Sequence, residues 1–210
     1  TCPIIAYSVP GRTGMDISVE TCVRLSQHPN INGIKEAGGD TSKAARILNE
    51  CGGDFFLWSG NDDQISPLIA LGARGVISVL SNVRPRETMS LTHAALNGDQ
   101  QTAGRLQCEL MPLIDALFCE VNPIPVKKAM ELLGWKVGGL RLPLVEPSAR
   151  SSWRASRLAR RACRSRRSAT PTSLASPPPS AEHKATPSIF QAGTILSGSG
   201  FGLHVPKPRT

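Results

Sequence analysis

Three side chains near the start of the chain have the chemistry for reactions at carbonyl groups: Tyr7, Arg12 and Lys35. Lys35 follows residues 32–34 and ends the second expected strand, where an ammonium group is costly to bury unless it is neutral or paired. Desolvation lowers the pKa of a lysine, and the neutral amine is the nucleophile that forms a Schiff base with a ketone. From residue type alone, a solvent-exposed lysine or one paired with Glu36 is the more common arrangement.

Tyr7 precedes a turn rich in glycine and proline, residues 10–14, and Arg12 lies within that turn. Tyr7 is the only tyrosine of the chain, and its hydroxyl is a candidate proton relay. A tyrosine at a strand end more commonly packs its ring and hydrogen-bonds its tip. A guanidinium held by such a turn suits bidentate binding of a carboxylate, although the spacing fits an exposed loop arginine equally well.

The remaining candidate groups give weaker signals. Asp62 and Asp63 stand at the start of an expected helix, where acidic side chains complement the helix dipole and need no further role. His28 and His93 have no partner cluster, and the glycine pairs match no phosphate-binding loop. Widely spaced cysteines without a CxxC pair argue against a zinc site and favour reduced thiols in a cytoplasmic protein: Cys2, Cys22, Cys51, Cys108 and Cys119. We therefore expect no metal site.

The elements that position these residues repeat one pattern four times, a short apolar strand followed by a helix. We expect strands at 3–7, 31–35, 55–59 and 75–79, with helices at about 18–27, from 40 or 41 through 48, from 62 to 71, and 85–96. Continuously apolar strands are typical of parallel strands buried on both faces. Four such strands form either an open doubly wound sheet or half of a (β/α)8 barrel, and the pattern does not choose between them.

After Gly98 the pattern changes to helices only, at about 100–117 and 125–133. We therefore expect three regions: four βα units in 1–98, a helical domain in 99–148, and an Arg-, Ser- and Pro-rich tail in 149–210 that is disordered. No apolar run is long enough for a transmembrane helix, and the first residues do not resemble a signal peptide.

The net charge of +8 arises in the tail. Residues 1–149 hold 13 basic and 15 acidic side chains, which gives −2, whereas residues 150–210 hold 11 and 1, which gives +10. The segment 150–167 has eight arginines and no acid, a composition that binds phosphate without sequence specificity. Trp153 is the only stacking aromatic nearby and no recognition module is present, so binding of nucleic acid is the weaker alternative.

Six segments, in this order and at fitting spacing, closely resemble the dihydrodipicolinate synthase family of pyruvate-dependent class I aldolases. They are YSVPGRTG (7–14), GIKEAGGD (33–40), SGNDD (59–63), GVISV (75–79), NPIPVK (122–127) and LRLP (140–143). The resemblance covers about residues 1–146. It implies an α/β fold that is the C-terminal half of a (β/α)8 TIM barrel, followed by a helical appendage.

The resemblance also implies a role for each candidate residue in a Schiff-base-forming carbon-oxygen lyase of lysine and diaminopimelate biosynthesis. Lys35 would form a covalent imine with pyruvate, without any metal or organic cofactor, and Tyr7 would relay protons to that intermediate. Arg12 would bind the carboxylate of the second substrate, aspartate 4-semialdehyde. Gly60 and Ile77 would line the pyruvate pocket through backbone atoms. The intact family is commonly a homotetramer.

The sequence departs from the family in two places. The upstream half of the barrel is absent, and with it a threonine of the proton relay, a tyrosine from a neighbouring subunit and the lysine-inhibition site. We therefore expect little or no synthase turnover from this chain alone. After Ser148 the family's closing amphipathic helix is replaced by Arg, Ser, Ala and Pro, which a shifted reading frame would explain.

Three alternatives remain open from the sequence. Another pyruvate aldolase, of the sialic-acid or sugar-acid lyase type, shares the Schiff-base lysine, although the sialic-acid branch usually lacks an arginine at the position of Arg12. The chain could also be an inactive fragment with a nucleic-acid-binding tail, or a remnant whose open sheet edges promote association.

Overall fold

The computed structural model describes residues 2–149, residue 152 and residues 194–197. These residues group into two compact units, 2–115 with 194–197 and 116–149 with 152. The boundary expected between 98 and 99 stays a prediction. Most of the predicted tail, with its arginine-rich segment, lies outside the described residues.

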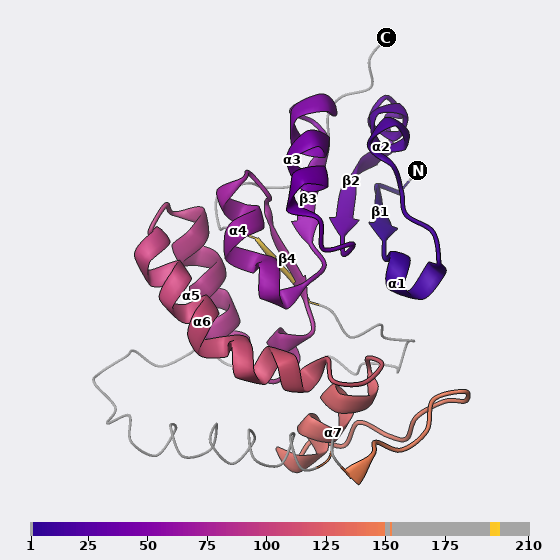
Figure 1. Cartoon of the computed structure of the whole chain (residues 1–210), viewed down its shortest axis with the longest axis vertical. Helices are drawn as coiled ribbons and strands as arrows, with labels where there is room; N and C mark the ends of the chain where they lie inside the picture. Colours follow the sequence, from indigo (N-terminus) through magenta and orange to yellow (C-terminus); the bar gives the residue numbers. More distant parts are fainter. Residues whose placement is uncertain (1, 150–151, 153–193, 198–210) are drawn as a thin grey trace. The chain divides into compact units, whose positions relative to one another are not determined.

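A five-stranded sheet forms the centre of the first unit (Figure 1). The strands pair in chain order, with β1 to β4 parallel and β5 antiparallel to β4. The bounds are β1 (Ile4–Ser8), β2 (Ile31–Glu36), β3 (Phe56–Ser59), β4 (Gly75–Ser78) and β5 (Thr194–Ser197). The sequence analysis predicted the first four strands to within one residue at either end, and it did not predict β5.

The order of the parallel strands distinguishes the two architectures that the strand–helix pattern left open, of which the family resemblance implied the barrel. In a doubly wound sheet the strand order reverses at a switch point, so a later strand pairs with the far side of the first. Here β1, β2, β3 and β4 follow one another without reversal, and a helix follows each strand. This order is the one found in a (β/α)8 barrel.

The helices begin and end at residues whose local chemistry explains them. Ser18 caps the helix that begins at Val19 by accepting a hydrogen bond from the Thr21 amide, and Asp40 caps the helix that begins at Thr41 by accepting from the Ser42 and Lys43 amides. The bounds in the first unit are α1 (Pro10–Thr13), α2 (Val19–Ser26), α3 (Thr41–Glu50), the 3-10 turn η1 (Asp62–Gln64), α4 (Ile65–Ala70), the 3-10 turn η2 (Leu80–Asn82), α5 (Pro85–Leu96) and α6 (Gln100–Leu117), which ends in the second unit. The predicted helices at 18–27, 40–48, 85–96 and 100–117 agree with these bounds.

The core of the first unit lies on one face of the parallel sheet. Ile34, Leu57 and Val76, one from each of β2, β3 and β4, are completely buried. Ile47 of α3 and Leu68 of α4 are each 1% exposed. The helices therefore cover this face of the sheet. Because successive strand residues point to opposite faces, the next residue of each strand projects to the other face.

The second unit contains the end of α6 and α7 (Ile124–Leu132), close to the helix predicted at 125–133. Lys127 donates a hydrogen bond to the Gly139 carbonyl, which holds the segment after α7 against that helix. Across the part of the chain that the structure describes, no helix has both the length and the apolar character needed to cross a membrane.

Candidate active site

Tyr7 and Lys35 are neighbours at the carboxyl ends of β1 and β2. They are register partners in the parallel pair, and Lys35 is in turn the partner of Trp58 on β3. Partnered residues on parallel strands project to the same face, so all three side chains lie on the face opposite to the buried helix layer. The Lys35 Nζ lies 4.1 Å from the centroid of the Tyr7 ring, a cation–π contact. In barrels, this end of the strands carries the active site.

The environment of Lys35 lowers the pKa of its amine. Burial lowers the pKa of Lys35, the positive charge of Arg12 lowers it further, and the negative charge of Asp62 opposes both. None of the described carboxylates lies within ion-pair distance of its Nζ. A lysine in this state has a larger fraction of nucleophilic amine at neutral pH than an exposed lysine.

The alternative in which Lys35 pairs with Glu36 is wrong. Glu36 is the next residue on β2, so its side chain projects to the opposite face of the sheet. There it is 2% exposed and forms an ion pair with Lys43, with 2.9 Å between Oε2 and Nζ. A fully solvated Lys35 is also excluded, because the side chain is half-buried.

Arg12 lies in the loop that leaves β1. The single turn of α1 begins with Pro10 and ends at Gly14, whose φ of 68° is a left-handed conformation that favours glycine. Arg12 is exposed, and no described carboxylate pairs with it. Burial raises the pKa of Tyr7 and the charge of Arg12 lowers it, so the guanidinium acts on both Tyr7 and Lys35.

Gly60 follows β3 and packs directly against β2. Its N–H donates to the Glu36 carbonyl oxygen at 2.7 Å, and a Cβ at this position would lie 3.2 Å from Lys35 Cε. Ser59 is the register partner of Val76, so Ile77, the next residue on β4, projects to the face that carries Lys35. Four of the predicted site residues thus share one face at the strand ends, and Arg12 stands in the adjoining loop; their roles stay predictions.

Asp62 has a role that the sequence analysis missed. It was assigned only to the helix dipole, but the side chain is 1% exposed and its Oδ2 accepts hydrogen bonds from the Val79 and Leu80 amides at 3.0 and 2.8 Å. Burial raises the pKa of Asp62, and the two amide hydrogen bonds lower it. Asp62 therefore ties the end of β3 to the end of β4. Asp63 is exposed, in keeping with the simpler assignment.

A buried lysine was missed as well. Lys43 lies one turn before Ile47 on the buried side of α3, and its side chain is 10% exposed. A lysine on the apolar side of an amphipathic helix was the available signal, because lysine is rarely buried unless it is paired.

The other weak candidates gain nothing from the structure. No group of three or more histidine, cysteine or acidic side chains suited to a metal ion occurs among the described residues. Cys2, Cys22, Cys51 and Cys108 are free thiols. His28 is exposed, and its Nδ1 accepts a hydrogen bond from the Asn30 amide.

Proteins of known family resemble this chain in sequence. Residues 1–160 match the Dihydrodipicolinate synthetase family. A 4-hydroxy-tetrahydrodipicolinate synthase from Exiguobacterium sibiricum is 55% identical over 146 residues, which are 70% of this chain and 50% of that protein. The chain spans about half the length of the curated relatives it matches.

Solved structures of the same kind also match. Dihydrodipicolinate synthase from Aquifex aeolicus superposes with a TM-score of 0.74 at 40% identity, over 77% of this chain and 55% of that chain. The chloride-inhibited enzyme from Acinetobacter baumannii in complex with pyruvate superposes with a TM-score of 0.72 at 40% identity, over 76% of this chain and 54% of that chain. The family match over most of the chain, the barrel order of β1 to β4 and the lysine near the end of β2 lead to one conclusion: the chain belongs to the dihydrodipicolinate synthetase family and carries part of its (β/α)8 barrel.

Proposed function

We propose that this chain carries the imine-forming part of a 4-hydroxy-tetrahydrodipicolinate synthase site, which condenses pyruvate with L-aspartate 4-semialdehyde. One observation carries the proposal: Lys35 is half-buried beside the Tyr7 ring with its Nζ 4.1 Å from the ring centroid, and no described carboxylate neutralises it. The similar protein from Exiguobacterium sibiricum and the pyruvate complex from Acinetobacter baumannii support the reaction and its first substrate.

The proposed chemistry begins with attack of the neutral Lys35 amine on the C2 carbonyl of pyruvate, which expels water and leaves a protonated imine. The imine withdraws electrons, so the methyl group loses a proton and becomes an enamine carbon. That carbon attacks the aldehyde of the second substrate, and the aldehyde oxygen takes up a proton. The amino group of the second substrate then attacks C2, closes the ring and releases the lysine amine.

The other site residues have supporting roles in this proposal. Tyr7, at the edge of the imine, relays the protons. Arg12 binds the carboxylate of aspartate 4-semialdehyde by a bidentate contact, for which its exposed guanidinium is suited. Gly60 and Ile77 line the pyruvate side through backbone atoms. No metal or organic cofactor takes part, since the lysine imine is itself the electron sink.

Trapping the imine tests the proposal at its first step. The chain is incubated with pyruvate and sodium borohydride and then digested with trypsin, and the peptides are mapped by mass spectrometry. Trypsin does not cleave after a modified lysine, so the expected product is a carboxyethyl adduct on the peptide from Leu25 to Lys43. Prior unfolding in urea should abolish the adduct, because the reactivity comes from the folded environment.

Two lysine variants complete the test. Lys35→Met should remove the adduct. Lys128→Met is the matched control, because Lys128 is a surface lysine whose Nζ pairs with Glu131 at 3.1 Å, and it should leave trapping unchanged. An adduct that is absent from the wild-type chain, or that forms on another lysine, contradicts the proposal.

The homotetrameric assembly, the cytoplasmic location and the low turnover of the chain by itself stay predictions from the resemblance. Lyase activity of another pyruvate-aldolase type is not favoured, since the curated relatives reported above carry the synthase name. The arginine-rich segment on which nucleic-acid binding would depend lies outside the described residues.

A further inference from the structure

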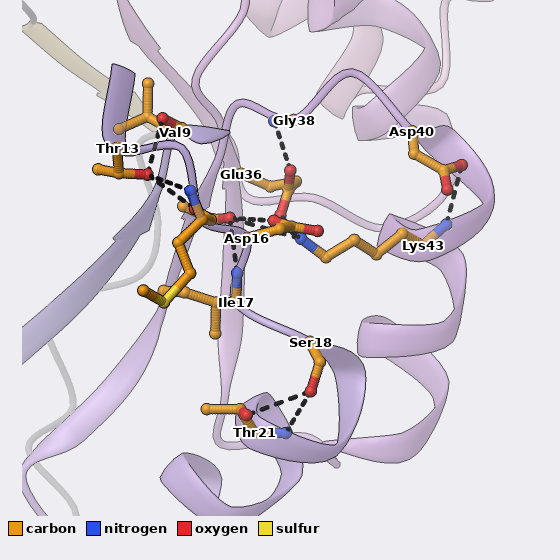
Figure 2. A network of polar contacts seen from close by, with 12 residues as sticks. Val9, Thr13, Asp16, Ile17, Ser18, Thr21, Glu36, Gly38, Asp40 and Lys43 are labelled. Carbon is orange, nitrogen blue, oxygen red and sulfur yellow. Dashed lines mark hydrogen bonds and ion pairs between the residues drawn. The ribbon is translucent and has the colours of Figure 1, made fainter. Parts of the chain in front are cut away.

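Figure 2 shows the Lys43 side chain reaching Asp16 and Glu36 in a partly buried ion cluster. Because Glu36 follows Lys35 on β2, this cluster lies on the face of the sheet opposite to Lys35. We call Ser8, Asp16, Glu36 and Lys43 the outer cluster. The Lys43 Nζ is 2.5 Å from Asp16 Oδ1, 2.9 Å from Glu36 Oε2 and 3.4 Å from Ser8 Oγ. The Ser8 hydroxyl in turn donates to Asp16 Oδ1 at 2.6 Å.

Each acceptor in the outer cluster is next to a part of the proposed site. Ser8 directly follows Tyr7 on β1, and Glu36 directly follows Lys35 on β2. Asp16 lies in the segment 9–18 between β1 and α2, which also carries Arg12. Lys43, on α3, therefore contacts the ends of β1 and β2 and the segment that carries Arg12, on the face of the sheet opposite to Lys35.

Glu36 extends this connection to β3. Its Oε1 accepts a hydrogen bond from the Gly38 amide at 2.5 Å, which shapes the chain as it leaves β2. Its backbone oxygen accepts from the Gly60 amide at 2.7 Å. Displacement of Glu36 would therefore move the backbone that follows Lys35 and the adjacent backbone that follows β3.

The burial of these charges indicates a geometric role. The Glu36 and Lys43 side chains are 2% and 10% exposed. Burying an ion pair carries a desolvation cost that its attraction barely offsets, so well-packed apolar side chains would stabilise the same position at least as well. Apolar side chains would not, however, fix the directions of three separate segments as charged hydrogen bonds do.

We propose that Lys43 is a positioning residue for the imine-forming site, and that it holds Tyr7, Lys35 and the Arg12 loop in their reactive arrangement through the outer cluster. This inference rests on the proposed function. Because consecutive strand residues face opposite ways, Lys43 acts through the backbone and does not touch the substrate.

The test compares borohydride-trapping kinetics, for each folded molecule, in wild type, Lys43→Met, Lys43→Arg and Ile47→Val. Lys43→Met should lower the trapping rate constant at saturating pyruvate by about ten-fold or more, because small misplacements of reacting groups are costly. The half-saturating pyruvate concentration should change by less than about three-fold, because no pyruvate contact is lost. Lys43→Arg should restore most of the rate, since a guanidinium can bridge the same acceptors.

Ile47→Val is the matched control, because Ile47 lies one turn further along α3, is 1% exposed and takes no part in the outer cluster. It should lower the denaturant midpoint without changing the rate constant. A merely structural role for Lys43 predicts the same behaviour for Lys43→Met, namely less folded protein with a normal rate constant, and that result would overturn the inference.

Asp16→Asn keeps the test available if Lys43→Met does not fold, because Glu36 still neutralises Lys43 and the Asp16 side chain is 45% exposed. The loosened Arg12 loop should shift the pH profile of trapping to higher pH. Tyr7, Arg12 and Asp62 are the titratable or charged groups around Lys35, and Arg12 is the one among them that lies in the same segment as Asp16. An unchanged profile contradicts the inference.

Failure of the proposed function is recognised separately. If the wild-type chain forms no adduct, the reactivity of Lys35 toward acetic anhydride, measured without pyruvate, decides the positioning role. Equal Lys35 acetylation rates in wild type and Lys43→Met overturn that role, and a slower rate in Lys43→Met supports it.

Discussion

Gly60 packs closely against the strand that carries Lys35. If Gly60 is replaced by alanine, the new Cβ lies 2.7 Å from the Ala37 Cβ and 3.0 Å from the Glu36 carbonyl oxygen. Carbon atoms in contact are normally about 3.5–4.0 Å apart, so the end of β3 must move away from β2 by about 1 Å. The same Cβ also lies 3.2 Å from Lys35 Cε, so the reactive side chain is displaced as well.

This displacement sets the expected size of the effect. Overpacking of a buried contact costs about 1–3 kcal/mol, and stretching the Gly60 to Glu36 hydrogen bond, 2.7 Å long in the wild type, falls within that range. We therefore expect Gly60→Ala to lower the free energy of unfolding by about 1–3 kcal/mol. A 1 Å shift of a reacting group slows a reaction by up to about 100-fold, so the trapping rate constant at Lys35 should fall by about 10- to 100-fold.

Urea unfolding and pyruvate–borohydride trapping measure the two effects on the same variant. Gly104→Ala is the matched control: Gly104 lies inside α6, and no atom lies within 4 Å of its added Cβ. Because the added methyl group meets nothing beyond its own helix backbone, Gly104→Ala should raise the free energy of unfolding by about 0.5–1 kcal/mol, as alanine does in a helix interior, and leave the trapping rate unchanged. A Gly60→Ala chain with wild-type stability and a wild-type rate would refute the close packing of β3 against Lys35.

Two further substitutions test the electrostatics of the site. Arg12→Ala should preserve imine formation but shift the pH profile of trapping to higher pH: the arginine charge lowers the pKa of Lys35, so its removal raises that pKa and leaves less neutral amine at a given pH. Arg24→Ala, a change at another exposed arginine, is the control and should leave the profile unchanged. Asp62→Ala should destabilise the chain by about 1–3 kcal/mol in urea unfolding, because it leaves two buried backbone amides without an acceptor, whereas Asp62→Asn keeps an acceptor oxygen and should cost less. The pKa of Asp62 is raised in the folded state, so its contribution to stability declines as pH rises from the unfolded value through the folded one, and Asp62→Asn should remove that part of the pH dependence. Equal stability of the two Asp62 variants would argue against the buried amide contacts.

Local sequence patterns were sufficient to locate most of the secondary structure. The apolar run 31–35 and the capping side chain of Asp40 act over a few residues, so β2 and the start of α3 follow from neighbouring positions alone. The chemical types of Tyr7, Arg12 and Lys35 and their places at strand ends likewise marked the candidate site, and ordered motifs indicated the family.

Longer-range features were not readable in the same way. Asp62 was assigned to the helix dipole because its partners, the Val79 and Leu80 amides, are 17 and 18 residues away. The pairing of Lys43 with Asp16 spans 27 residues and joins a helix to a loop. No periodicity encodes such contacts, because they depend on the register of β1 against β2 and on which face of the sheet α3 covers.

The sequence by itself determined four strands, their alternating helices and the residue types available for a Schiff base, since these depend on local propensity and on side-chain chemistry. The repeated strand–helix pattern left a doubly wound sheet and a barrel open, and the unreversed order of β1 to β4 confirmed the barrel that the family resemblance implied. Tertiary structure also decided the surroundings of Lys35. Strand register places its amine beside Tyr7. The pleat turns Glu36 to the opposite face, where its carboxylate pairs with Lys43. The physical reason is that pairing and pleat are set by hydrogen bonds between strands distant in sequence, which a local pattern does not contain.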